Sequence, residues 1–358
     1  MSRTEKRNLF DENLMEKARA LHERLNVVDF HHYIDLDLLK RRERGEVDIF
    51  RRIWIPIFRS GGVKVQVLPV SMGTEGAHIL PEMALRSVLI RMELYHQSID
   101  ENPDDLVLVR RYSDVEKALR EKKIACILGI ESGEAIGTSL EVLGILYRLG
   151  VRTLSLTWNR ANLLADGTGE PRGGGLTRMG KRIVQEMNRL GMIVDAAHIH
   201  EKGFWDIIET STKTVIVSHG NARALVDHPR NITDEQIRAV AQTGGVVGVT
   251  FVPRFVASQN PTVESVVDHI QHIANLVGTE HVGFASDLVT DLAKDFNECP
   301  SEERILAPGA VTGDVAGLEG IPNLSNLTAS LLSRGFKEEE IGQIMGMNFI
   351  RVLKEIVV

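Results

Sequence analysis

Short apolar runs alternate along the chain with longer stretches in which apolar residues recur at helical spacing. The runs consist almost entirely of β-branched and other apolar residues, which is typical of parallel strands buried on both faces. We predict eight strands, over residues 26–31, 63–69, 124–130, 151–157, 192–197, 214–218, 245–251 and 281–286.

The stretches between these strands have the periodicity of amphipathic helices. The clearest is 176–190, whose apolar residues fall on one face and which ends at a glycine stop signal. Further helices are predicted near 82–99, 113–122, 139–149, 201–210, 233–243, 262–277, 324–334 and 338–356.

Eight strands that alternate with helices predict an α/β protein with a (β/α)8 TIM-type barrel. We expect one domain over 1–358, with an N-terminal helix in 1–25, a barrel core in 26–290, and a long loop and C-terminal helices in 291–358. A doubly wound open sheet is the alternative. It is less favoured because no glycine-rich nucleotide-binding turn follows the first strand.

Composition and charge exclude several classes of protein. The 358 residues are 43% hydrophobic and carry a formal net charge of −7, which argues against a nucleic-acid partner. No apolar run approaches the roughly 18–20 residues of a membrane span, so no membrane partner and a cytoplasmic location are expected. Two cysteines, Cys126 and Cys299, cannot form a disulfide framework.

Polar residues that can bind metals or transfer protons follow most of the predicted strands. In a (β/α)8 barrel the carboxyl ends of the strands meet at one mouth, where active sites form. Each residue alone has a structural explanation, such as a hydrogen-bonded histidine, a helix cap or a turn. Together they favour a metal site, and in strand order they are His31 and His32, Glu131, His198, His219, and Asp287, while the strand at 151–157 ends in Trp158 and Asn159.

Imidazole and carboxylate ligands without thiolate are typical of Zn²⁺, or of a similar divalent ion such as Mn²⁺ or Fe²⁺. Glu131, between two histidine-bearing strand ends, could bridge two ions about 3.5–4 Å apart, with Asp287 as the proton shuttle. Whether one or two ions bind to each chain therefore stays open. Neither a phosphate-binding P-loop nor a Gly-x-Ser-x-Gly nucleophile motif is present.

Several segments of the chain resemble the renal (membrane) dipeptidase family, peptidase family M19 of the amidohydrolase-like barrels. The likeness runs from about residue 26 to 356. Its main segments are GIESGE at 129–134, GVRTLSLTWN at 150–159, the long block 175–232 and HVGFASD at 281–287.

The resemblance assigns roles to the candidate residues. It implies that His31 binds a first metal, that His198 and His219 bind a second, and that Glu131 bridges the two. Asp287 is implied as the catalytic acid/base beside the first metal. The resemblance also makes Arg230 the group that holds the substrate's terminal carboxylate, and Trp158 and Asn159 are expected to contact the substrate.

The implied reaction is metal-dependent hydrolysis of a dipeptide by a metal-activated hydroxide, with a D-residue tolerated on the C-terminal side. Relatives of this family also cleave N-acyl amino acids, and they are often homodimers. Two alternatives stay open: a hydrolase of another small amide with an altered or single-metal site, and a barrel without catalysis.

Two positions depart from the family pattern. Family members usually have His-x-Asp after the first strand, but here Tyr33 stands where the aspartate ligand is expected. A neutral phenol replaces a carboxylate poorly, so the first metal site is weakened, lost, or rebuilt with His32 or Asp35. Trp158 stands where mammalian members have a histidine.

Overall fold

The structure is a computed structural model that describes residues 10–71, 81–288 and 314–357. All eight predicted strands are present, and one short extra strand, β3, lies outside the ring and pairs with β4. The strands are β1 (Val27–Asp29), β2 (Val63–Ser71), β3 (Leu106–Leu108), β4 (Ile124–Glu131), β5 (Val151–Ser155), β6 (Ile193–Asp195), β7 (Val215–Ile216), β8 (Val247–Thr250) and β9 (Val282–Ala285).

The strands run parallel in the order β1-β2-β4-β5-β6-β7, with β8 and β9 paired beside them. Two further contacts join these sheets into a ring. The amide of Gly248 donates to the carbonyl oxygen of Val217 at 2.8 Å, and the amide of Asp287 donates to the carbonyl oxygen of His31 at 2.9 Å. The predicted (β/α)8 barrel is therefore confirmed, and the open-sheet alternative is wrong.

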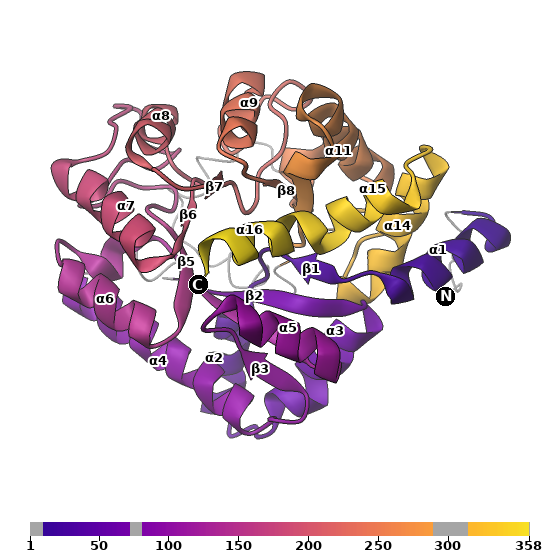
Figure 1. The fold of residues 1–358 in the computed structure, drawn as a ribbon, viewed down its shortest axis with the longest axis horizontal. Helices are drawn as coiled ribbons and strands as arrows, with labels where there is room; N and C mark the ends of the chain where they lie inside the picture. The colour runs from indigo at the N-terminus through magenta and orange to yellow at the C-terminus, as the bar shows by residue number, and fades with distance from the viewer. Residues whose placement is uncertain (1–9, 72–80, 289–313, 358) are drawn as a thin grey trace.

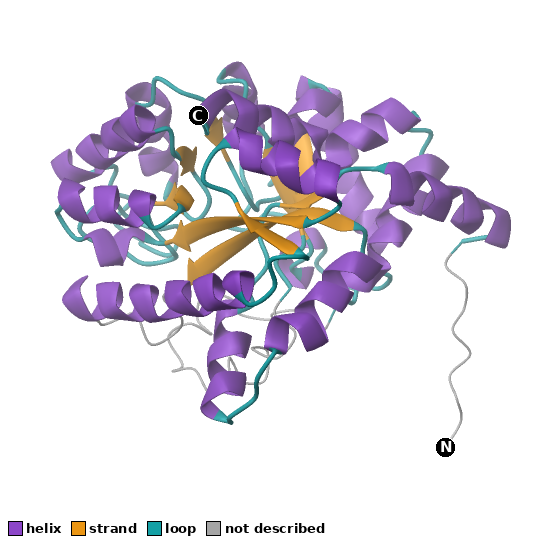
Figure 2. Ribbon diagram, turned by 60° about the horizontal axis from the view of Figure 1, so that its bottom comes forward, coloured by secondary structure: helices purple, strands orange, loops and turns teal. Residues whose placement is uncertain are grey.

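Helices surround the strands (Figures 1 and 2). The sequence missed α2 and α3 between β1 and β2, and the predicted helix 338–356 is divided by a π-helical turn at Gln343–Met347. The helices are α1 (Glu12–Arg24), α2 (Asp35–Glu43), α3 (Ile55–Ser60), α4 (Pro81–Asp100), α5 (Tyr112–Glu121), α6 (Leu140–Arg148), α7 (Arg178–Leu190), α8 (Glu201–Thr210), α9 (Asp234–Gln242), α10 (Pro253–Val256), α11 (Val263–Val277), α14 (Leu324–Ser333), α15 (Glu338–Gly342) and α16 (Asn348–Ile356).

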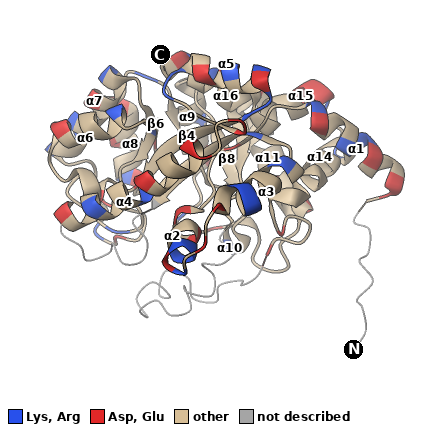
Figure 3. Ribbon diagram, turned by 90° about the horizontal axis from the view of Figure 1, so that it is seen from below, with Lys and Arg blue, Asp and Glu red and all other residues tan. Residues whose placement is uncertain are grey.

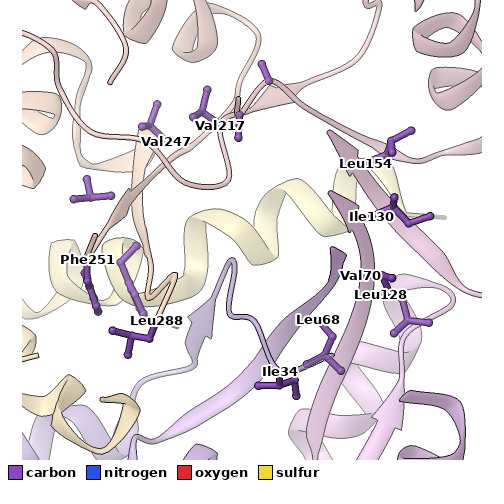
Figure 4. Close-up of a cluster of buried hydrophobic side chains, with 14 of the residues drawn as sticks. Ile34, Leu68, Val70, Leu128, Ile130, Leu154, Val217, Val247, Phe251 and Leu288 are labelled. Atoms are coloured by element: carbon purple, nitrogen blue, oxygen red, sulfur yellow. The ribbon is translucent and has the colours of Figure 1, made fainter. Parts of the chain in front are cut away.

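The alternation of side chains along β4 separates two hydrophobic cores. Leu128 and Ile130 belong to the large core between strands and helices, which Figure 4 shows in part. Ala125 and Ile127 belong to the smaller core inside the barrel. Since alternate residues of a strand share a face, Glu131 at the end of β4 is directed to the inside of the barrel.

Helix α16 closes the amino-terminal end of the barrel, on the side opposite α2 and α10 (Figure 3). Phe349 on this helix packs against Phe30, with ring centroids 4.3 Å apart. Gly283 makes room for Phe30, because a Cβ atom at residue 283 would lie 2.5 Å from Cζ of that ring. The base of the barrel is thus filled by aromatic packing, and only its opposite mouth can hold a polar site.

Some sequence predictions fall outside the described residues. Cys299 and most of the irregular stretch 288–322 are among them. Cys126 is buried in the outer core, as expected for a packing residue. In the part of the chain that is described, none of the helices combines the length and the apolar character that spanning a bilayer requires.

We expect Phe349→Ala to lower the free energy of unfolding by about 3–5 kcal/mol, since it leaves a cavity beneath the barrel. Urea unfolding followed by circular dichroism measures this change. Lys354→Ala, at an exposed position on the same helix, is the control and should change stability by less than about 1 kcal/mol. Equal effects of the two substitutions would contradict the role given to α16.

Candidate metal centre

Four side chains of types that can bind a metal meet at the mouth of the barrel. His31 follows β1, Glu131 ends β4, His198 follows β6 and His219 follows β7. All four are buried, each with no more than 6% of its surface exposed. The fold therefore brings together four residues that lie up to 188 positions apart in the chain.

The three imidazoles converge on a single oxygen of Glu131. Oε1 of Glu131 lies 3.0 Å from Nε2 of His198, 3.4 Å from Nε2 of His219 and 3.6 Å from Nε2 of His31. Ligand atoms about 2.0–2.2 Å from a tetrahedral Zn²⁺ are separated by roughly 3.3 Å, so each of these spacings to Oε1 is compatible with a shared ion. Among the described residues, the ligand atoms of His31, Glu131 and His219 all lie within 4.8 Å of one another, and Nε2 of His198 lies 2.8 Å from Nε2 of His219.

Hydrogen bonds orient two of the imidazoles. Nδ1 of His198 lies 2.9 Å from Oδ1 of Asn159, and Nδ1 of His219 lies 2.8 Å from Oγ of Ser218. Because the amide oxygen of Asn159 can only accept, Nδ1 of His198 carries the proton and Nε2 keeps its lone pair. Such outer contacts fix the tautomer that a metal ligand needs.

Burial determines the charge state of these histidines. It is the main cause that lowers the pKa of His31, His198 and His219 to about 3, and the nearby guanidinium of Arg230 contributes at each of them. The imidazoles are therefore neutral near pH 7, which is the form that binds metals.

Glu131 carries the negative charge of the cluster. Burial alone would raise the pKa of its carboxyl group, but the imidazoles of His31 and His198 hold that pKa well below the ordinary value. Its oxygen Oε1, like Nε2 of His31, is buried and has no hydrogen-bond partner. Unpartnered atoms of this kind are expected where an ion completes a site.

The second oxygen of Glu131 is occupied by Tyr33. The phenol donates a hydrogen bond to Oε2, and its ring packs edge-on against His31 with centroids 4.8 Å apart. Burial and the charge of Glu131 raise the pKa of Tyr33 well above 10, so its hydroxyl is a neutral donor. Where the family pattern has a carboxylate ligand, this chain has a hydrogen-bond donor.

Three residues of the site have a left-handed backbone conformation that side-chain-bearing residues seldom adopt. Their φ angles are +88° for Ser132, +65° for His198 and +46° for Asp287. Such conformations cost about 1–3 kcal/mol each and are found where the surrounding structure imposes them, commonly at functional sites. Each of these three residues directly follows a strand end or lies within the loop after it.

Asp287 follows β9, and its amide makes the contact with His31 that helps to close the ring. Its Oδ2 accepts a hydrogen bond from Oγ1 of Thr250 at 3.0 Å. Burial and the nearby charge of Glu131 raise the pKa of Asp287 to about 7. A carboxyl group with a pKa near the working pH can both take and return a proton.

Arg230 places a buried positive charge beside the cluster. Its Nη2 atom donates to the carbonyl oxygen of His219 at 3.3 Å, and Nε is buried without a partner. No carboxylate in the described residues forms an ion pair with it, which leaves its fork of donors available to a ligand.

Two alternatives from the sequence do not join the metal cluster. His32 lies with Nδ1 2.8 Å from Oγ of Ser286 and packs its ring against Trp54, and Asp35 pairs with Arg91 at 3.2 Å. Neither replaces the ligand that the family pattern has at position 33.

The two residues expected to contact substrate differ in their surroundings. Trp158 lies beside the ring of His198, with centroids 5.9 Å apart. Asn159, by contrast, uses its side-chain oxygen to hold His198, so its visible contact is with a metal-ligand candidate.

Sequence reasoning missed several supporting residues. Asp29 accepts hydrogen bonds from the amides of His31 and Ser286, and Thr250 holds Asp287. Asp29 interrupts an apolar strand in the same segment as His31, a signal that could have identified it. Thr250 gives no such signal, since threonine is common in strands.

The chain is similar to known metallopeptidases and amidohydrolases. The sequence model of the membrane dipeptidase family, peptidase family M19, matches residues 15–308 and 306–357. Dipeptidase tcpJ of Claviceps purpurea is 36% identical over 278 residues, which span 76% of this chain and 60% of that protein. The match therefore covers less than two thirds of the length of that relative.

Solved structures agree on the fold. An amidohydrolase from Pseudomonas aeruginosa superposes with a TM-score of 0.82 at 26% identity, covering 95% of this chain and 99% of that one. A metallopeptidase from Rhodobacter sphaeroides, bound to a phosphinate mimic of the dipeptide L-Ala-D-Ala, gives a TM-score of 0.80 at 23% identity, with 93% and 99% covered.

We expect Asn159→Ala to weaken Zn²⁺ binding about 10- to 100-fold, because His198 loses the contact that fixes its tautomer. Competition with a chromophoric chelator measures this affinity. Asn188→Ala is the control. It removes a side chain on helix α7 that forms hydrogen bonds with Ser211 and Thr212, and it should leave the affinity for Zn²⁺ unchanged. If Asn159→Ala binds Zn²⁺ as tightly as the parent chain, Asn159 does not orient His198.

Proposed function

The chain belongs to the membrane dipeptidase family, and we propose that it is a metal-dependent dipeptidase that works with one divalent ion. The observation that carries the proposal is the convergence of three neutral imidazoles on Oε1 of Glu131, beside Arg230 and Asp287. This arrangement combines a metal site, an anion-binding group and a proton carrier at one barrel mouth.

We propose one ion because the two oxygens of Glu131 have different neighbours. Oε1 faces His31, His198 and His219; the ligand atoms of His31, Glu131 and His219 lie within 4.8 Å of one another, and His198 lies beside His219. Oε2 is occupied by the hydroxyl of Tyr33, so it is not available as a bridge to a second ion. The ligand set suits Zn²⁺, which takes four nitrogen or oxygen ligands of this kind.

A bound divalent ion would supply Lewis acidity, which polarises the scissile carbonyl and lowers the pKa of a water molecule. Asp287 would take the proton from the attacking water and pass it to the leaving amine. Thr250 would hold the carboxyl group of Asp287 in place, since its hydroxyl donates to Oδ2. Burial of the whole cluster would exclude bulk water and strengthen these electrostatic interactions.

Arg230 would bind the C-terminal carboxylate of the substrate through its guanidinium fork. Tolerance for a D-residue on the C-terminal side is supported by the related metallopeptidase that binds a mimic of L-Ala-D-Ala. A small dipeptide, rather than a longer peptide, suits a site in which the carboxylate-binding group lies close to the metal ligands.

The purified chain loaded with Zn²⁺ is expected to hydrolyse L-Ala-D-Ala and to lose this activity when a chelator removes the ion. Asp287→Asn should lower kcat by about 10²–10⁴-fold, because the proton carrier is lost. Asp268→Asn, at an exposed ion pair with Arg334, is the matched control and should retain full activity.

Two results would contradict this function. Cleavage of N-acyl amino acids without cleavage of any dipeptide would favour a hydrolase of another small amide. Zinc binding without turnover of either class of substrate would favour a barrel without catalysis.

Metal analysis is expected to find one Zn²⁺ per chain, and Tyr33→Asp is expected to raise this number toward two. The substitution frees Oε2 of Glu131 and adds a carboxylate ligand beside it. Inductively coupled plasma mass spectrometry of dialysed protein gives the stoichiometry.

Tyr33→Phe is the control for the Tyr33→Asp variant. It removes the hydroxyl but adds no ligand, so the stoichiometry should stay at one. Two ions per chain in the unaltered protein would refute the single-ion proposal without touching the proposed hydrolysis.

A further inference from the structure

A second arginine, Arg254, lies next to Arg230 at the mouth of the barrel. The guanidinium carbons of Arg230 and Arg254 lie 5.7 Å and 5.0 Å from the ring centroid of Phe255. Both guanidiniums therefore lie within 6 Å of the same aromatic ring. The cation–π contacts hold them there without neutralising their charges.

The surrounding structure fixes the two arginines relative to each other. Arg230 belongs to the loop after β7, and Arg254 belongs to α10, directly after β8. Nδ2 of the buried Asn231 donates to the carbonyl oxygen of Phe255 at 3.0 Å, and the ring of His228 packs 4.5 Å from that of Phe255. The loop and α10 are therefore joined on both sides of Arg230.

Both arginines feel the charge of Asp287, and neither forms an ion pair in the described residues. The charge of Asp287 acts on Arg254 as well as on Arg230. Each has a buried Nε atom without a hydrogen-bond partner, and no ion pair within 4 Å joins either of them to a carboxylate of the described residues. Two partly or fully buried like charges without anions are unfavourable, so this pair is expected to bind anionic ligand groups.

We propose that Arg230 and Arg254 form a two-cation site that selects dipeptides with an acidic C-terminal residue. This inference rests on the proposed dipeptidase function. Arg230 binds the main-chain carboxylate, and Arg254 binds the carboxylate of the aspartate or glutamate side chain. Arg254 is thus a specificity-determining residue, since one carboxylate needs only one guanidinium fork.

Substrate pairs that differ only in charge test this assignment. The Zn²⁺-loaded chain should cleave L-Ala-D-Asp at least roughly tenfold faster, by kcat/KM, than its neutral isostere L-Ala-D-Asn, and the same order should hold for the L,L-dipeptides. Arg254→Met should abolish this preference while leaving kcat/KM for L-Ala-D-Asn within about twofold.

Two matched variants accompany Arg254→Met. Arg254→Lys keeps the positive charge and should keep part of the preference. Arg238→Met removes an exposed arginine on α9 and should change nothing. Unchanged zinc content and far-ultraviolet circular dichroism would show that each variant is folded.

A binding measurement separates this proposal from the proposed function. Calorimetric titration with succinate and with its monoamide, succinamate, requires no turnover. Tighter binding of succinate that disappears in Arg254→Met supports the two-cation site, even if no dipeptide is cleaved. Equal binding of both compounds, or an equal loss of L-Ala-D-Asp and L-Ala-D-Asn cleavage in Arg254→Met, overturns it.

Discussion

The buried carboxylate of Glu131 is the group on which the rest of this site depends. An anion in the interior is tolerated only where donors or cations surround it. Here a phenol donates to Oε2, while Oε1 faces three neutral imidazoles without a hydrogen-bond partner, and a bound divalent cation would balance its charge. These groups follow three other strands, so they surround the carboxylate of Glu131 only when the barrel is closed.

The barrel supplies the rigidity that such a cluster needs. Alternation along β4 directs Glu131 inward, while α16 and Phe30 fill the opposite end, so polar groups gather at one mouth only. The left-handed backbone at His198 and Asp287 shows that local conformational preference gives way there to the requirements of the site. Hydrophobic packing therefore stabilises the walls and the base of the barrel, whereas the strained backbone conformations lie at its mouth.

Tyr33, in place of the expected aspartate, changes the charge and the number of ligands at the centre but not its place in the barrel. An aspartate there would add a negative charge and a ligand, whereas Tyr33 adds a neutral donor that holds one oxygen of Glu131. Arg230 and Arg254 then act on a less negative cluster. In this arrangement, the proposed single ion and the proposed preference for an anionic substrate are compatible with each other.

The sequence by itself determined the eight strands and the identity of most residues at their ends. Buried parallel strands read as apolar runs, and the residues after each run must lie at the mouth. It missed α2, α3 and α10, because helices of nine, six and four residues are too short to show a clear helical periodicity, and it missed β3, a three-residue strand outside the ring.

Only the tertiary structure decided how those residues face one another. Which oxygen of Glu131 meets Tyr33, and which side chain orients His198, depend on contacts between residues 98 and 39 positions apart. The position of Arg230 near the ring of Phe255, beside Arg254, likewise depends on how the loop after β7 meets α10. A sequence pattern predicts the face of a strand from which a side chain projects. It does not predict the distance from that side chain to a group on another strand.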